Sequence, residues 1–449
     1  MTNLRTILVA VVLSHGIAQT ALGDNLIDVY RLTLANDKRY AGAIGSYKAG
    51  VEKYDQGLSG LLPTLSVDGE KMYSYGEIEY TDTTSFDSGD RRYEDSRYSL
   101  TLTQPLYRKE NFAVYEQGKA QSAAAGAQFD IAKQDLILRT AQAYFEVLSA
   151  QQNLSTTTAH VASMEAQANE ARRKLAVGAA TRIEVNETKA RADVARAQEI
   201  AARDELINKR YALWRMSNAK IRTLDELPLG FTLDRISPND VDELMKIAEN
   251  ENFQLQVLRY NLEAATQEVE RARAGHYPNL DLVARYSSDY STGSVYTASP
   301  SDTSVKSAGL RLDIPLYQGG LVDSRVREAL GALEKARADL EDARRDVESQ
   351  IARYLHATVS GAERVRALEQ ALNSSNDAAR ATRLGFNVGT RILVEVLDAE
   401  REAYDVALDL INARQEYVLN WLRLKANIGT LNEDDLKTLN SYLVSPAKG

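Results

Sequence analysis

The chain has 449 residues, a net charge of −9 and no cysteine. Its length is enough for two or three ordinary domains. The missing cysteine excludes disulfides, thiolate metal sites and a lipid anchor on an N-terminal cysteine. The acidic balance argues against nucleic acid as a partner, because affinity for nucleic acid comes mainly from Lys and Arg that neutralise phosphates.

Residues 1–23 have the features of a secretory signal peptide. Arg5 gives a positive start, an apolar stretch follows from Ile7 to Leu13, and Ala21-Leu22-Gly23 is a small-residue cleavage site. The apolar stretch is too short to cross a bilayer as a helix, so a retained anchor is the weaker alternative. We expect an exported protein whose mature chain begins at Asp24, with the net charge changed from −9 to −10 by the loss of Arg5.

The histidines of the mature chain give no sign of a metal site, a cofactor or a catalytic centre. His160, His276 and His356 are far apart and share no ligand spacing. The sequence also lacks the short motifs of nucleotide-binding and hydrolytic sites. We therefore expect that the protein is not an enzyme.

Two copies of one plan make up the chain. Three landmarks recur in the same order at offsets of 215, 210 and 211 positions. They are Leu62-Pro63-Thr64-Leu65 with Tyr277-Pro278-Asn279-Leu280, Leu100 to Tyr107 with Leu310 to Tyr317, and Val177-Gly178 with Val388-Gly389. This pattern predicts a tandem duplication, with a first repeat at 24–222, a linker at 223–240, a second repeat at 241–429 and a tail at 430–449.

Each repeat is predicted to contain one very long helix. In the second, Val326, Leu333, Leu340, Val347 and Tyr354 recur every seven residues, which is typical of a coiled coil. No proline interrupts the stretch from Leu321 to Leu384, and the first repeat has a matching stretch from Asn111 to Leu175. Such a helix is about 95 Å long, which predicts that it lines something extended.

Four segments alternate between apolar and polar residues, two in each repeat. In one of them Tyr98, Leu100 and Leu102 alternate with Ser99, Thr101 and Thr103. Similar alternation follows Leu280 and precedes Ile314, whereas Thr64 to Tyr80 is less regular because Lys71 and Glu77 share the phase of Leu65. Alternation over about ten residues is typical of transmembrane barrel strands, although a strand of a soluble sandwich is the alternative for any single segment.

Four strands cannot close a barrel alone, because about eight are the practical minimum. An open sheet edge is not tolerated in lipid, so at least two chains must share one barrel. The strand count by itself leaves two, three or four chains open. Polar loops at Thr81–Asp95 and Ser291–Thr303 are expected at the cell surface.

Two motifs carry a resemblance to a known family. They are Asn387-Val388-Gly389-Thr390-Arg391 with the following Val394 to Ala399, and Leu422 to Ala426 with the following Gly429 to Glu433. At these residues the chain resembles the TolC family of outer-membrane channel-tunnels, and the likeness covers nearly all of the mature chain.

The resemblance implies a mainly helical homotrimer in the outer membrane. Each protomer would give four strands to a shared twelve-stranded β-barrel and long antiparallel coiled-coil helices to a tunnel that extends into the periplasm. Besides outer-membrane lipid, the implied partners are a periplasmic adaptor protein and an inner-membrane transporter of the ABC or RND type. Drugs and secreted proteins both remain open as cargo.

The resemblance also implies a gate at the periplasmic end. Arg391 would be its basic clamp residue and Glu184 the acidic partner, while Glu395 and Asp398 would form acidic rings at the constriction. Phe386 stands where the family's best-known member has a hydrogen-bonding tyrosine, and a phenyl ring cannot make that bond. A periplasmic coiled-coil adaptor is the main alternative to this interpretation, but it would lack the two pairs of alternating strands.

Overall fold

The computed structural model describes residues 25–81, 88–221, 224–228, 230–233 and 237–444. The predicted signal peptide, 1–23, lies outside the described residues, as do parts of the first polar loop, the linker and the tail. The elements are α1 (Leu26–Asn36), α2 (Lys38–Ser59), β1 (Thr64–Ile78), β2 (Gly89–Tyr107), α3 (Lys109–Ala176), α4 (Arg182–Ser217), α5 (Val241–Glu251), α6 (Phe253–Arg273), η1 (Ala274–His276), β3 (Asn279–Ser291), β4 (Ser301–Asp313), α7 (Leu321–Asn387), α8 (Leu393–Ile428) and α9 (Glu433–Tyr442).

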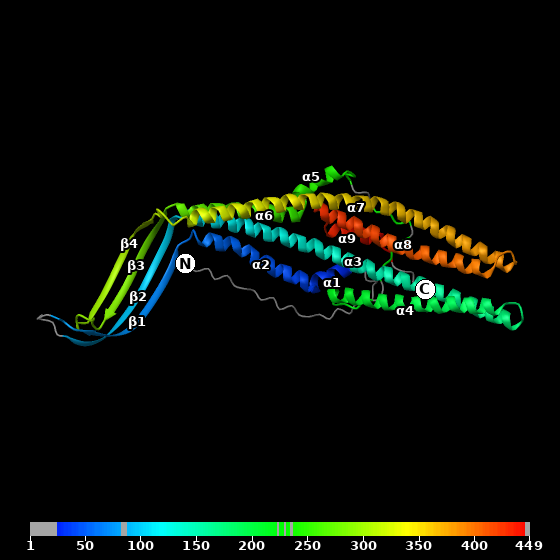
Figure 1. Cartoon of the computed structure of the whole chain (residues 1–449), viewed down its shortest axis with the longest axis horizontal. Coiled ribbons are helices and arrows are strands. Elements are labelled where there is room, and N and C mark those ends of the chain that lie inside the picture. Colours follow the sequence, from blue (N-terminus) through cyan, green and yellow to red (C-terminus); the bar gives the residue numbers. More distant parts are fainter. Residues whose placement is uncertain (1–24, 82–87, 222–223, 229, 234–236, 445–449) are drawn as a thin grey trace, which may run out of the picture.

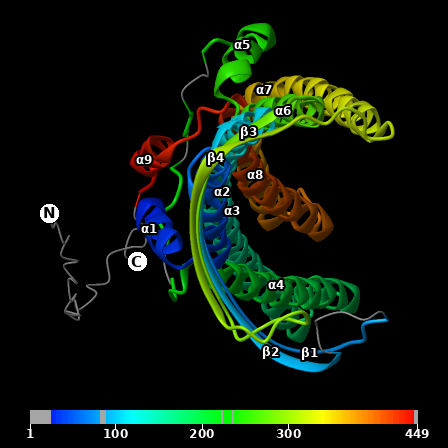
Figure 2. The ribbon, with the colours of Figure 1, turned by 90° about the vertical axis from the view of Figure 1, so that its left-hand side faces the viewer.

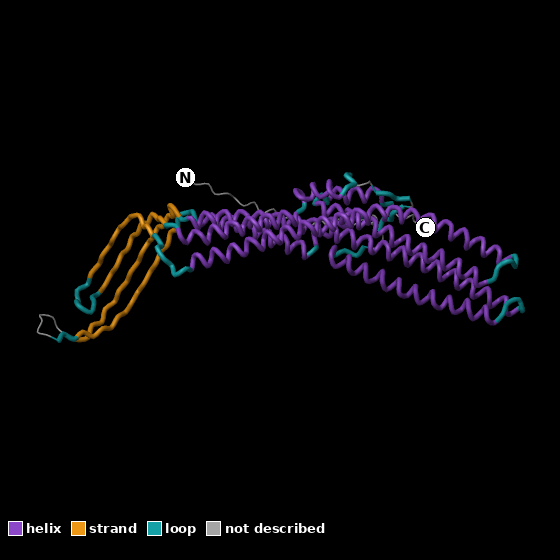
Figure 3. The backbone as a smooth tube through the Cα atoms, turned by 45° about the horizontal axis from the view of Figure 1, so that its top comes forward, coloured by secondary structure: helices purple, strands orange, loops and turns teal. Residues whose placement is uncertain are grey.

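The protomer is a long rod with the strands at one end (Figures 1 and 3). α3 has 68 residues and α7 has 67, which corresponds to about 100 Å each, so the two long helices that the sequence predicts are confirmed. The turns α3–α4 and α7–α8 both lie at the end opposite the sheet (Figure 1). None of the helices within the described residues has the length and apolar character needed to cross a membrane.

The strands form one antiparallel sheet in the order β1-β2-β3-β4, as the alternation predicts. Neighbouring rows across the sheet are Leu65–Leu102–Ala284–Ala308 and Ser66–Thr101–Arg285–Ser307. Because side chains of successive rows point to opposite faces, one face is apolar and the other polar. Seen from this end, the sheet curves into an arc (Figure 2), whereas α1 and α9 lie farther along the rod (Figure 1).

Two details of the strands differ from the prediction. Residues 89–95, expected in a polar loop, are strand, because β2 pairs with β1 from Gly89 onward. Lys71, the residue that breaks the alternation of β1, pairs with Glu94 of β2 at 2.5 Å and lies over the ring of Tyr73. Ionic and aromatic partners on the same face therefore accommodate this charge.

The helix before each strand pair is interrupted, which the sequence analysis missed. Asp37 ends α1 and caps α2, and Asn252 ends α5 and caps α6. Each side chain accepts a hydrogen bond from the backbone N–H three residues later, that of Tyr40 or Leu255. Asp and Asn favour such caps over helix interiors, so both breaks are readable from residue type.

The largest apolar core lies midway along the rod, where α1 and α9 pack on α3, α4 and α8. Its centre includes Tyr144, Phe145 and Leu422, all nearly inaccessible to solvent. A second cluster joins α5 to α7 and the end of α8. At that end, Gly429 has a φ of 94°, and a Cβ there would stand 2.2 Å from the carbonyl oxygen of Glu251. Described residues of the linker and the tail also pack into the core midway along the rod, and the exact repeat boundaries stay a prediction.

Asp37, between α1 and α2, makes a pH-dependent contribution to the stability of the fold. Burial by itself would raise the pKa of Asp37, but hydrogen bonds from Arg139, 2.9 Å away, and from the Tyr40 backbone outweigh it and hold the pKa below the ordinary 3.8. A lowered folded-state pKa stabilises the fold above the unfolded value, and this stabilisation is lost as the pH falls through the folded pKa.

We expect Asp37→Asn to lower the free energy of unfolding at neutral pH by about 1.5–3 kcal/mol, because the cap is kept and the charged hydrogen bonds are lost. The difference from wild type should shrink as the pH falls below about 3.8. Thermal unfolding followed by circular dichroism at several pH values measures it. Asp28→Asn, in an exposed pair with Arg31, is the control and should change little. An equal loss at neutral and acidic pH would contradict the assignment.

Candidate functional site

The two hairpin turns at the end of the rod have the same construction. Gly178 and Gly389 follow the ends of α3 and α7 with φ angles of 77° and 81°. In the second repeat the N–H of Thr390 donates to the carbonyl of Gly385 at 2.8 Å, and the equivalent bond of the first repeat has the same length. This is the Schellman arrangement, in which a residue of positive φ ends the helix, so it explains the Val-Gly pair in both repeats.

Glu184 and Glu395 occupy equivalent places, 211 positions apart, in the first turns of α4 and α8. Glu184 Oε2 accepts the backbone N–H of Thr181 at 3.0 Å, and Glu395 Oε2 accepts that of Ile392 at 3.2 Å. In α4 the Thr181 hydroxyl oxygen returns the bond by accepting the N–H of Glu184. Both predicted gate acids therefore also cap a helix, a role that the Thr-x-x-Glu spacing at 181–184 signals.

Arg391 lies at the exposed tip beside Glu395. Its Nη1 is 3.3 Å from Glu395 Oε1, which lies four residues later in the first turn of α8. A Cβ on Gly385 would stand 2.8 Å from the Cγ of Arg391, so this glycine leaves room for the arginine to fold over the end of α7. Within the described chain no ion pair joins Arg391 to Glu184, and this pairing stays a prediction.

Phe386 lies between the two hairpins, in a small cavity that Glu184 also lines. The ammonium of Lys174, on α3, is 5.0 Å from the centre of the Phe386 ring. Lys174 also donates to Glu170, and this hydrogen bond lowers the pKa of Glu170. A cation over an aromatic face is attractive without any hydroxyl. Phe386 thus has a partner on the first-repeat hairpin that the sequence analysis did not foresee.

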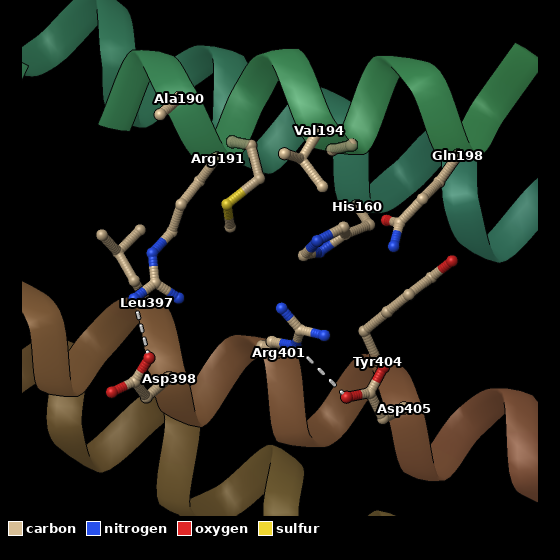
Figure 4. A pocket seen from close by; sticks show the side chains of 12 residues that line it. His160, Ala190, Arg191, Val194, Gln198, Leu397, Asp398, Arg401, Tyr404 and Asp405 are labelled. Carbon is tan, nitrogen blue, oxygen red and sulfur yellow. Dashed lines mark hydrogen bonds and ion pairs between the residues drawn. The ribbon is translucent and has the colours of Figure 1, made fainter. Parts of the chain in front are cut away.

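Asp398 lies farther from the tip, at a cavity of about 320 Å³ between α4 and α8 (Figure 4). Its Oδ1 is 2.9 Å from Nη2 of Arg191, which comes from α4. Arg191 is not among the residues that the sequence predicts for the site. Arg191 follows Glu184 by seven residues and so lies on the same face of α4, but only the fold places that face against α8.

His160 of α3 lines the same cavity (Figure 4). Its ring stacks on Tyr404 of α8 with 4.4 Å between centroids, and the Tyr404 hydroxyl is 3.0 Å from that of Thr157. Burial lowers the pKa of His160, although Glu400 and Asp405 act in the opposite direction. The described residues contain no group of His, Asp and Glu suited to a metal ion. His160 therefore packs α8 onto α3 as a largely neutral ring.

Known proteins resemble this chain in sequence and in fold. The sequence profile of the family described as outer membrane efflux protein matches residues 29–219 and 244–430, which takes in most of both repeats. The chain belongs to this family. As an outer membrane efflux channel of the TolC family, it is a transporter and not an enzyme, and it lies in the outer membrane with a periplasmic extension.

Relatives of this channel match over almost its whole length. The proteases secretion protein PrtF of Dickeya chrysanthemi is 32% identical over 445 residues, covering 98% of this chain and 96% of the relative. The outer membrane protein TolC of Escherichia coli is 31% identical over 458 residues, covering 99% and 90%. The Campylobacter jejuni CmeC outer membrane channel has the same fold, with a TM-score of 0.78 at 18% identity over 93% of this chain and 89% of that one.

Two substitutions of Glu184 distinguish its role as a helix cap from the effect of its negative charge. Glu184→Gln keeps an acceptor for the Thr181 N–H, whereas Glu184→Ala removes it and should destabilise the first turn of α4 by about 0.3–1.5 kcal/mol. Hydrogen exchange of the amides at 182–186 should be faster in the Ala variant alone. Glu205→Ala, which removes an exposed carboxylate that pairs with the partly buried Lys209 farther along α4, is the control. Unchanged exchange in Glu184→Ala would argue against the cap.

Proposed function

We propose that three copies of this chain form a channel-tunnel that exports substrates from a periplasm-spanning pump complex to the cell exterior. The observation that carries the proposal is an open four-stranded antiparallel sheet at the end of helices about 100 Å long. The outer strands β1 and β4 each leave one backbone edge without a strand partner in the described chain. Neighbouring protomers would supply these partners.

The sheet has one apolar and one polar face, as expected for a barrel wall with lipid outside and water inside. Leu65, Leu102 and Leu310 share the apolar face, and Leu65 and Leu310 are 66% and 67% exposed in the single chain. Tyr73 and Tyr286 lie on this face farther along the strands, where aromatic girdles contact the membrane interface. The polar face would line the pore. Three protomers would give twelve strands, which the family membership favours over two or four chains.

Secreted protein is the cargo that the relatives favour. The Dickeya chrysanthemi relative is a proteases secretion protein, and so is the alkaline protease secretion protein AprF of Pseudomonas aeruginosa, 32% identical over 431 residues. We infer type I secretion, with an ABC transporter and a periplasmic adaptor as partners. Drug efflux with an RND-type pump is the second candidate, favoured by the efflux description of the family.

The trimer and its cargo can be tested on protein extracted from outer membranes. Native mass spectrometry in detergent should show three chains, each beginning at Asp24, and a stable monomer would contradict the assembly. In cells, deletion of the gene should abolish secretion of a protein substrate while the same substrate accumulates inside. Loss of drug resistance with normal protein secretion would favour the second candidate instead.

We further propose that the hairpin tips are the periplasmic gate, opened by untwisting of the helices. Glu184, Phe386, Arg391, Glu395 and Asp398 would line or hold it, as the resemblance implies. The shared cavity of Phe386 and Glu184 supports this, because the closed tip would bring the two hairpins together there. Threefold symmetry would repeat Glu395 and Asp398 around the axis, where their charge would favour cations.

Removal of Arg391 should make the tunnel leak. An exposed ion pair stabilises a structure by roughly 0.2–1 kcal/mol, so the predicted Arg391–Glu184 pairs of three protomers would stabilise the closed gate by about 0.6–3 kcal/mol. We expect Arg391→Ser to raise single-channel conductance and antibiotic sensitivity without lowering the trimer yield. Arg380→Ser, which breaks an exposed pair with Asp377 on α7, is a matched control and should leave both unchanged.

The same recordings test the other gate residues. Phe386→Tyr should tighten closure if its hydroxyl finds a backbone partner, and Glu395→Ala with Asp398→Ala should reduce cation selectivity. Wild-type conductance in Arg391→Ser together with wild-type selectivity in the double variant would remove these residues from the gate.

A further inference from the structure

The polar face of the sheet carries an arginine at its centre. Arg285 is the middle residue of β3 and is exposed in the single chain. The residues level with it across the sheet all carry hydroxyl groups and are Ser66, Thr101 and Ser307. An arginine in the middle of a barrel strand strongly destabilises the barrel when it faces lipid. Arg285 lies on the opposite face, the one that would line the pore.

The acidic residues on the same side of β3 already have arginine partners. Asp281 and Asp289 each lie four residues from Arg285, which is about 13 Å along a strand. Arg108 donates to both carboxylate oxygens of Asp281, at 2.7 and 2.6 Å. Arg97 donates to Asp289. Within the described chain no ion pair involves Arg285, so these two acids leave its charge uncompensated.

The other acidic residues of the polar face lie at other levels of the sheet. Asp68 is two residues nearer the β1–β2 turn and two strands away, so its backbone is about 12 Å from that of Arg285. Glu70, Asp95 and Asp313 lie four to six residues from the level of Arg285. Salt screens exposed charges over about 10 Å at 0.1 M. The part of the polar face around Arg285 is therefore positively charged.

Arg311, on β4, also belongs to the polar face, but carboxylates lie close to it. Asp281 stands directly opposite it across the strands, and Asp313 is two residues away on β4. Both lie within about 7 Å of its backbone, whereas the acidic residues nearest to Arg285 among the described residues of this face are about 12 Å away. Arg285 thus presents a less compensated charge than Arg311 does.

We propose that Arg285 of three protomers forms a ring of positive charge that binds carboxylates of the exported polypeptide inside the barrel. This proposal rests on the trimeric barrel and the protein cargo of the proposed function. Twelve strands spaced by about 4.8 Å and tilted by about 40° enclose a barrel whose radius at the backbone is about 12 Å. An extended arginine side chain covers about half of that radius, so a polypeptide in the barrel passes within its reach.

The guanidinium group suits this role because its planar set of N–H donors matches the two oxygens of a carboxylate. It also keeps its charge at any physiological pH. An acidic segment of cargo would exchange its contacts among three equivalent arginines, each of them exposed to water. Such contacts favour acidic segments over basic ones without holding the cargo permanently.

A short dye-labelled peptide tests the ring directly. Hexaglutamate should bind to the purified trimer in detergent at about 0.1 M salt, and fluorescence anisotropy measures its affinity. Arg285→Gln should raise the Kd several-fold. Lys306→Gln is the matched control, because it also removes one positive charge but lies in the neighbouring row, on the apolar face. Its Kd should equal that of the wild type. An unchanged Kd in Arg285→Gln, or an equal rise in Lys306→Gln, would overturn the ring.

Chemical modification gives a second measurement, in which the charge can be restored. The chain has no cysteine, so Arg285→Cys introduces the only thiol. A methanethiosulfonate reagent that attaches a trimethylammonium group should recover much of the affinity for hexaglutamate, whereas one that attaches a sulfonate should weaken binding further. The same reagents on Tyr286→Cys, on the other face of the sheet, should leave the affinity unchanged. Equal affinity of Arg285→Cys after complete reaction with either reagent would overturn the ring.

Native mass spectrometry of the same samples separates this proposal from the proposed function. A trimer that binds hexaglutamate equally well with and without Arg285, or whose wild type does not bind it, contradicts the ring alone. A protein that forms no trimer contradicts the shared barrel and with it the proposed function.

Discussion

The sheet of a single protomer has two open edges, and this constraint governs the rest of the architecture. Backbone N–H and C=O groups along β1 and β4 need partners, and lipid offers none. We infer that further copies of the chain supply them. The duplication suits such an assembly, because each repeat contributes one strand pair and one helical hairpin. An arc of sheet that continues into the next protomer would also place the long helices side by side around one axis.

Much of the fold is readable from the sequence because it depends on local rules. Long stretches without proline and with a seven-residue apolar repeat can only be extended helices, and α3 and α7 follow them closely. Alternation identified the strands, although Lys71 showed that a charge in the apolar phase does not end a strand when Glu94 can pair with it. The loop before β2 is shorter than predicted. Polar residues at the end of a strand cannot be told from loop residues by sequence, because only their pairing partners distinguish them.

The candidate site was only partly predictable, for a physical reason. Arg391, Glu395 and Asp398 belong to a contiguous motif, so resemblance identified them. Arg191 lies far from that motif in sequence, and its relation to α8 depends on how the two hairpins pack. The caps at Glu184 and Glu395 were missed for a different reason. A carboxylate at the start of a helix was interpreted by its charge, while its hydrogen bond to the backbone was overlooked.

The two repeats are not equal at their tips, and this difference bears on how the duplicated halves have diverged. Thr181 completes a reciprocal cap at the start of α4, whereas the equivalent Ile392 has no side-chain acceptor for α8. The first turn of α8 therefore begins with one hydrogen bond fewer, so it frays more readily than that of α4. The two halves have therefore diverged in how firmly the second helix of each hairpin begins, and α8 is the less firmly capped of the two.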